Sequence, residues 1–99
     1  MSVMLLRQKV KDGTVEQAEA AVRDLFATLD GVRPEGIRYA STRVADSSTF
    51  VILFELEDGA EDPRPAIPEF GRFLEQLKGF VDGPGEVEQL DVVGSYNLF

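Results

Sequence analysis

Residues 48–57 constrain the fold most, because they form the longest β-favouring run in the chain and carry large apolar residues on both faces. Successive side chains of a strand point in opposite directions, so the run separates into two apolar sets. These sets are Phe50, Ile52, Phe54 and Leu56 on one face, and Val51 and Leu53 on the other. An edge strand of a solvated sheet has one polar face. The pattern therefore predicts a central strand that is covered on both sides.

The rest of the hydrophobic pattern predicts three more strands and two helices. We expect strands at 3–10, 37–45 and 86–96, and helices at 14–30 and from about 68 to 81. The order β-α-β-β-α-β is that of the ferredoxin-like α+β fold, with a four-stranded antiparallel sheet and both helices on one face. At 99 residues the chain is expected to be a single domain spanning 1–99. One sheet face is then left without a cover.

Two local signals predict the limits of the first helix. Thr14 and Gln17 have the spacing of a capping box, in which each side chain bonds the other residue's backbone N–H. Gly31 follows the apolar stripe and can adopt the left-handed conformation that ends many helices. We therefore expect the helix to begin at Thr14 and to stop at Asp30.

Composition excludes several classes of function. The net charge of −8 and the dispersed basic residues disfavour binding to nucleic acid and to anionic membranes. The chain has no Cys, His or Trp, so it has no disulfide, no zinc site of the Cys or His type and no histidine base. The acidic residues at 55–62 do not have the spacing of a calcium loop, and no metal or cofactor is expected. The first apolar run is too short for a signal peptide or a membrane span, which predicts a cytoplasmic protein.

Over its whole length the chain resembles the dimeric α+β barrel superfamily, and within it the antibiotic biosynthesis monooxygenase-like domains. The resemblance rests on the opening strand at 4–7, the helix from Thr14, the turn at 46–48 with the strand after it, and a last strand that reaches residue 96. In that superfamily two sheets face each other across a twofold axis. The resemblance thus implies a homodimer through the face bearing Val51 and Leu53, together with the last strand.

The resemblance also implies a class of activity, namely cofactor-independent oxygenation of an aromatic or polyketide-like substrate that itself activates oxygen. Haem-degrading relatives use an Asn, Trp and His set, which a chain without His or Trp cannot reproduce. Catalytic residues are therefore not transferred to any position here. Two alternatives stay open: a non-catalytic dimer that binds a small ligand, and a scaffold protein whose interior is fully packed.

Polar residues of the strand at 37–45 are the first candidates for a ligand site. Tyr39 can donate a hydrogen bond to an anionic or phenolic ligand, and Arg38 or Arg43 can pair with a negative charge. Ser41 lies on the same strand. Arg7 and Gln8 lie where the first strand turns polar, and one of them is a candidate for the end of the barrel or pocket. The alternative interpretation is that all of these are ordinary surface residues.

Aromatic residues are the second set of candidates. Phe70, Phe73 and Phe80 of the second helical segment are placed to form the wall of an apolar pocket between helix and sheet, and Phe54 of the central strand is expected beside it. The alternative is plain core packing, which applies if no void lies beside them. A cavity beside these residues would support the pocket, and its absence would support core packing.

Overall fold

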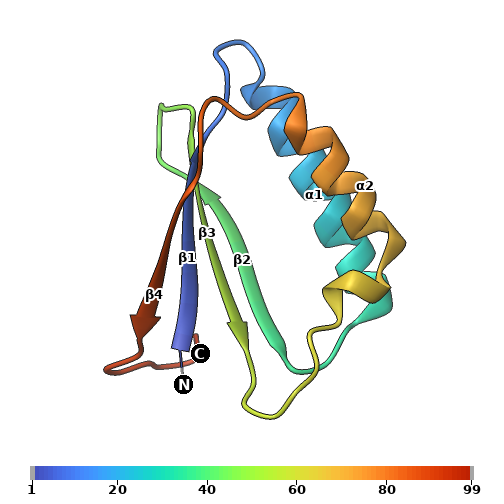
Figure 1. Cartoon of the computed structure of the whole chain (residues 1–99), viewed down its shortest axis with the longest axis vertical. Helices are drawn as coiled ribbons and strands as arrows, with labels where there is room; N and C mark the ends of the chain where they lie inside the picture. Colours follow the sequence, from blue (N-terminus) through green and yellow to red (C-terminus); the bar gives the residue numbers. More distant parts are fainter. Residues whose placement is uncertain (1, 99) are drawn as a thin grey trace.

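The computed structural model describes residues 2–98 and consists of a four-stranded sheet with two α-helices on one face (Figure 1). The elements are β1 (Ser2–Lys9), α1 (Val15–Val32), β2 (Ile37–Arg43), β3 (Thr49–Leu56), the 3-10 helix η1 (Arg64–Ala66), α2 (Pro68–Lys78) and β4 (Glu86–Asp91). The strand order is β2-β3-β1-β4, with every neighbouring pair antiparallel. The predicted ferredoxin-like fold is confirmed, including β1 and β3 at the centre of the sheet.

The register of the strands determines which side chains face the helices. Phe54 pairs with Met4 of β1 and with Tyr39 of β2, so these three side chains share one side of the sheet. We call this side, which faces α1 and α2, the inner face, and the opposite side, which bears Val51 and Leu53, the outer face. The division of β3 into two apolar sets is thus the division between these two faces.

Sheet and helices are packed firmly together at one end. Val10, Ala18 and Phe50 are buried there in one cluster, and Phe80 packs against it. The Lys11 backbone N–H donates to the Phe80 carbonyl at 2.7 Å, which joins the end of β1 to the segment after α2. The closely packed end holds the two layers at a fixed spacing, and the space between them further along depends on the side chains that fill it.

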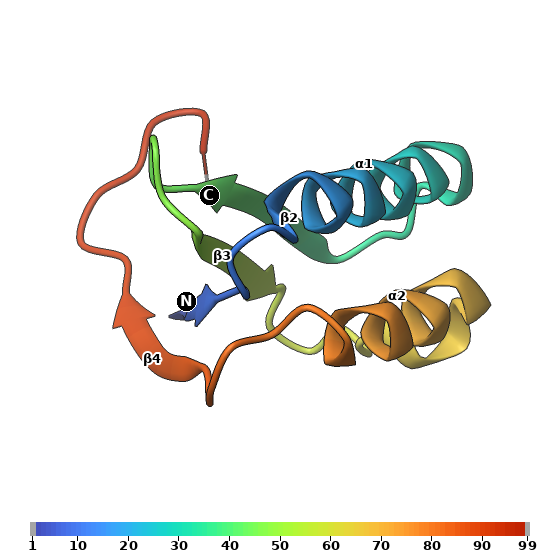
Figure 2. The ribbon, with the colours of Figure 1, turned by 90° about the horizontal axis from the view of Figure 1, so that it is seen from above.

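Residues 92–98, the C-terminal tail, cross the outer face of the sheet, away from the helices, and end near β2 (Figure 2). The Arg38 side chain of β2 donates to the Leu98 carbonyl at 3.4 Å. The prediction that the last strand reaches residue 96 is therefore wrong, because pairing with β1 ends where Asp91 lies opposite Ser2. Beyond that point the chain leaves the sheet and covers part of the outer face, which the sequence pattern predicts to lack a cover.

The ends of α1 also differ from the prediction. The Thr14 hydroxyl donates to the Lys11 carbonyl at 2.6 Å, so it does not cap the helix and the expected capping box is absent. The helix continues through Gly31, and the left-handed residue is Arg33, whose φ is 53° and whose N–H donates to the Leu29 carbonyl. No helix within residues 2–98 is both long and apolar enough to span a membrane.

Candidate functional site

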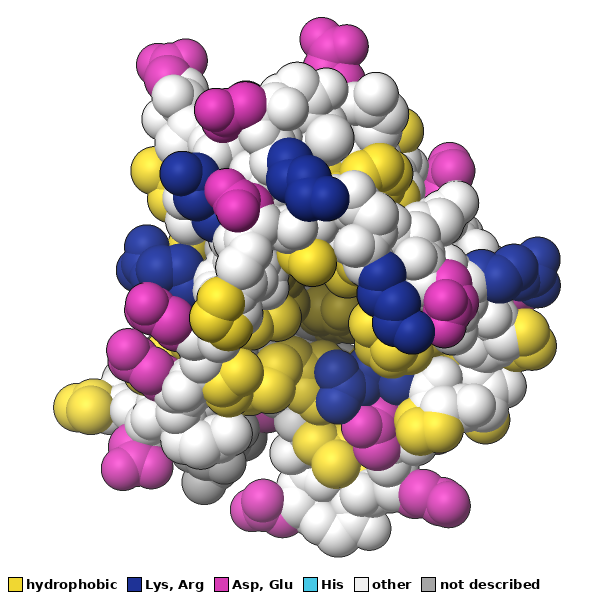
Figure 3. All heavy atoms as spheres, turned by 45° about the horizontal axis from the view of Figure 1, so that its top comes forward, with side chains coloured by type: hydrophobic (Ala, Val, Ile, Leu, Met, Phe, Trp, Pro, Cys, Tyr) yellow, Lys and Arg dark blue, Asp and Glu magenta, His cyan; other side chains and the backbone are white. Residues whose placement is uncertain are grey.

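A cavity of about 170 Å³ lies between the inner face of the sheet and the two helices. Its wall is mainly apolar and includes Met4, Leu6, Ile52, Phe70, Phe73 and Leu77. Figure 3 shows a hollow in this region of the surface, with hydrophobic side chains at its bottom and charged side chains around it. A void of this kind between helix and sheet is the usual position of a small-molecule site. It also excludes a fully packed interior.

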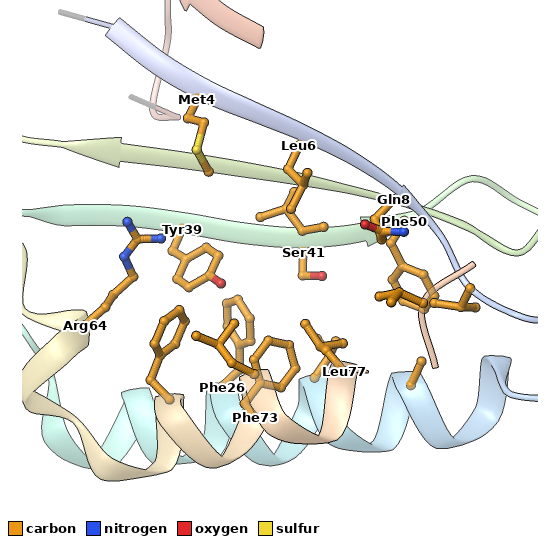
Figure 4. Close-up of a pocket in the computed structure, with 17 residues that line it drawn as sticks. Met4, Leu6, Gln8, Phe26, Tyr39, Ser41, Phe50, Arg64, Phe73 and Leu77 are labelled. Atoms are coloured by element: carbon orange, nitrogen blue, oxygen red, sulfur yellow. The ribbon is translucent and has the colours of Figure 1, made fainter. Parts of the chain in front are cut away.

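Four polar side chains reach the cavity, from three different parts of the chain: Gln8, Tyr39, Ser41 and Arg64. The hydroxyls of Tyr39 and Ser41 both extend from β2 into the space between sheet and helices (Figure 4). Arg64 lies at one end of this space and Gln8 at the other. An apolar wall with a few converging polar groups can orient a small molecule as well as enclose it.

Tyr39 is held by aromatic contacts on both sides. Its ring centroid lies 5.1 Å from that of Phe26 and 5.4 Å from that of Phe54, the latter edge to face. Burial raises the pKa of Tyr39 above its ordinary value of 10.0; the positive charge of Arg64 lowers it and the negative charge of Asp62 raises it, and burial is the largest effect. The hydroxyl therefore remains protonated at neutral pH and can donate a hydrogen bond.

Arg64 forms a forked ion pair with Asp62 at one end of the cavity. Its Nε lies 3.1 Å from both carboxylate oxygens and its Nη2 lies 2.8 Å from Oδ2. The guanidinium stacks 3.7 Å from the centre of the Phe54 ring. Hydrogen bonds from the Arg64 side chain lower the pKa of Asp62 below its ordinary value of 3.8, so the carboxylate stays ionised. The pair thus brings a positive and a negative charge to the site together.

At the opposite end, Gln8 is fixed by the chain around it. Its amide nitrogen donates to the carbonyls of Lys9 at 2.8 Å and Gly83 at 3.2 Å. A Cβ at position 85 would lie 2.7 Å from the Gln8 side-chain oxygen and 2.8 Å from Leu6 Cδ1, so any larger residue would have to displace the ends of these two side chains. Gly85 thereby lets the segment before β4 pack closely against the end of the cavity.

The structure brings most of the site residues proposed from the sequence to the inner cavity. Tyr39, Phe70 and Phe73 line the cavity. Phe54 is buried against the Tyr39 ring, beneath the guanidinium of Arg64. Phe70 and Phe73 form a second ring pair, and the Arg64 guanidinium lies between the two pairs, 3.7 Å from the Phe54 ring centre and 5.5 Å from that of Phe70.

Arg43 lies outside this aromatic group. Its Nε is 2.6 Å from a carboxylate oxygen of Glu19 on α1, and its Nη1 donates to the Ser47 carbonyl at 2.9 Å. Arg43 faces the same side of the sheet as Tyr39, but Glu19 holds its charge at the edge between β2 and α1. The pair joins strand to helix and places no cation in the cavity.

Sequence reasoning missed Arg64, because the acidic, proline-bearing segment around it was interpreted as a solvated loop. The signal that could have found it is the spacing of Asp62 and Arg64, each followed by proline. Proline limits the backbone, and the Arg64 backbone N–H donates to Asp62 Oδ1 at 3.0 Å, so the turn itself directs the guanidinium. Within residues 2–98 no three Asp or Glu side chains come close enough to hold a metal ion.

Known proteins resemble this chain in structure alone. No family model matches the sequence. No curated protein matches it either.

Among solved structures, a candidate antibiotic biosynthesis monooxygenase from Nitrosomonas europaea superposes with a TM-score of 0.75 at 16% identity, covering 95% of this chain and 100% of that one. A second antibiotic biosynthesis monooxygenase structure superposes with a TM-score of 0.73 at 20% identity, covering 95% of this chain and 100% of that one. A candidate of the same description from Caulobacter crescentus superposes with a TM-score of 0.69 at 20% identity, covering 94% of this chain and 90% of that one. The chain therefore has the fold of the antibiotic biosynthesis monooxygenase-like proteins, as the sequence resemblance predicts.

Proposed function

We propose that this chain, which has the fold of the antibiotic biosynthesis monooxygenase-like proteins, acts as a cofactor-independent monooxygenase on a small aromatic substrate. The observation that supports the proposal is the inner cavity, in which an apolar wall meets the hydroxyls of Tyr39 and Ser41 and the guanidinium of Arg64. Fold alone does not define an activity, so the proposal depends on this site.

The reaction draws its electrons from the substrate. A hydroquinone and O₂ give a hydroxyquinone and water: one oxygen atom enters the ring, the other leaves as water, and the hydroquinone supplies all four electrons. The protein's contribution is to bind and orient the ring and to exclude bulk water. Tyr39, protonated at neutral pH, donates a hydrogen bond to the substrate oxygen and stabilises negative charge that develops there.

A non-catalytic binding protein is the second candidate, and one observation favours it. The four polar groups that line the cavity include no ionised base, because Tyr39 holds its proton, Arg64 is a cation, and the other two side chains are uncharged. A site of this kind binds an aromatic molecule without removing a proton from it. The two candidates share the same cavity and differ in whether the bound molecule reacts.

Oxygen uptake with hydroquinone tests the enzymatic proposal. We expect purified protein without added metal or cofactor to accelerate uptake above the uncatalysed rate, with one O₂ consumed per hydroxyquinone formed. Tyr39→Phe is expected to lower this rate about tenfold, because it removes one hydrogen bond to the developing charge. Tyr96→Phe is the matched control, since Tyr96 is 90% exposed and lies in the C-terminal tail. Binding of hydroquinone without uptake would select the binding protein, and absence of binding would contradict both.

The proposed assembly is a homodimer in which the outer face and the C-terminal tail meet a second copy. The tail presents large apolar side chains to solvent: Val93 is 101%, Tyr96 90% and Leu98 59% exposed. Below the tail, Glu55 is buried. Its Oε1 lies 3.6 Å from Arg38 Nε, and its Oε2 has no hydrogen-bond partner within the described residues. Exposed apolar groups beside a buried carboxylate with one unsatisfied oxygen are typical of a surface that another chain completes.

A further inference from the structure

The charge of the inner cavity is balanced before any ligand enters. Arg64 is the only cationic residue in the cavity wall as described, and two of its three nitrogens bond the Asp62 carboxylate. Tyr39, Ser41 and Gln8 add no charge. The remaining nitrogen, Nη1, makes no hydrogen bond within residues 2–98. It can donate a hydrogen bond to a ligand, while the charge of the guanidinium as a whole is already balanced by Asp62.

An anionic ligand would lose more hydration free energy on entering such a site than it would gain from its contacts there. A carboxylate that leaves water must recover its hydration energy from a cation, and this recovery is large only when the cation is unpaired. Here Asp62 stands within hydrogen-bond distance of the same guanidinium and would repel the incoming charge. The net charge of −8 over the whole chain opposes an anion as well.

The size of the cavity limits the ligand to one ring. Its volume is about 170 Å³. A protein cavity of about 150 Å³ holds benzene, so a benzene ring with one or two small substituents fills the available space. Fused three-ring molecules of the polyketide kind exceed it. The aromatic side chains of Phe70 and Phe73 provide the flat apolar contact that such a ring needs.

We propose that the cavity selects an uncharged, single-ring aromatic molecule bearing a hydroxyl or carbonyl group, and that Asp62 sets this selectivity by neutralising Arg64. The inference rests on the proposed function, because it takes the inner cavity as the binding site. The Tyr39 and Ser41 hydroxyls bind the substituent of the ligand from β2. Asp62 is a specificity-determining residue: it touches Arg64 rather than the ligand.

Calorimetric titration with phenol and benzoate at neutral pH tests the selectivity, since the two share a ring and differ in charge. We expect phenol to bind the unaltered protein about tenfold more tightly than benzoate. Benzene, which lacks the hydroxyl, is expected to bind more weakly than phenol by about fivefold.

Asp62→Asn tests the cause of the selectivity. Asparagine keeps the side-chain oxygen that accepts the Arg64 backbone N–H but removes the charge. Benzoate affinity is expected to rise about tenfold in this variant, with phenol affinity changed by less than about threefold. Glu61→Gln is the matched control: it removes the same charge from an exposed neighbour in the same loop and should leave both affinities unchanged. A structural disturbance alone would weaken both ligands together.

Three outcomes overturn the inference in different ways. Benzoate binding to the unaltered protein as tightly as phenol contradicts charge selection but leaves the cavity as a binding site. Equal gains for benzoate in Asp62→Asn and Glu61→Gln assign the effect to net charge and not to Arg64. Failure of phenol, benzene and benzoate alike to bind removes the proposed function itself. The comparison of ligands on the unaltered protein tests the charge selection even if the Asp62→Asn variant does not fold.

Discussion

Substitution of Ser41 by phenylalanine is expected to weaken phenol binding by about 100-fold while the protein remains folded. The Ser41 side chain extends from β2 into the inner cavity and lies level with Ile52 of β3 (Figure 4). A phenyl ring at this position would fill most of the inner cavity and leave no room for the ligand, since one benzene ring fills a cavity of about 150 Å³. Because the space is empty beforehand, the added ring does not force the overpacking that usually destabilises a core.

Two controls make this result specific. Ser41→Ala keeps the cavity open and removes one hydroxyl, so we expect only about a threefold loss of affinity. The midpoint of thermal unfolding of Ser41→Phe should equal or exceed that of the unaltered protein. Full phenol affinity in Ser41→Phe would show that the ligand binds elsewhere, and equal losses in both variants would assign the effect to the hydroxyl instead of to the space.

Leu53→Asp is expected to convert the proposed homodimer into monomers. Leu53 lies in the middle of β3 on the outer face, beside the groove that the C-terminal tail forms with Val3 and Leu90. An aspartate there would become an unpaired charge buried between two copies, at a cost of roughly 3 kcal/mol, or about 100-fold in the dimer dissociation constant. Sedimentation at micromolar concentration measures the change directly.

Val32→Asp controls for the general effect of an added negative charge. Val32 is 54% exposed at the end of α1, on the helical layer and not on the outer face. It should leave the sedimentation coefficient unchanged. A monomer in the unaltered protein, or equal dissociation by both variants, would contradict the proposed interface.

The sheet was predictable because its signal is local. The alternation of Phe50, Val51, Ile52 and Leu53 determines two apolar faces for any strand geometry, and their register then places Tyr39 beside Phe54. The apolar stripes of the helices predict an inner layer in the same way. Tyr39, Phe70 and Phe73 line the cavity because the apolar pattern determines the inner faces of the elements that carry them. Arg43 shares the inner face of β2, and only its ion pair with Glu19 keeps it apart.

Features that depend on contacts between distant segments were not predictable. Arg64 reaches Phe54 only because η1 turns back over the sheet, and the C-terminal tail leaves the strand pattern only where its partner strand ends. The sequence contains no sign of an ion-pair partner for Arg43, yet its side chain pairs with Glu19 of α1. In each case several partners of similar chemistry are available to the residue. Tertiary packing determines which partner it contacts, and residue spacing alone does not predict it.

Amide chemical-shift mapping with phenol on the isotopically labelled protein tests most directly whether the inner cavity is the binding site. We expect the largest shifts at Tyr39 and Ser41 of β2 and at Phe73 of α2, with saturation at one phenol per chain. Shifts that cluster on the outer face around Leu53 and Tyr96, or that stay absent as phenol is raised, would contradict the account.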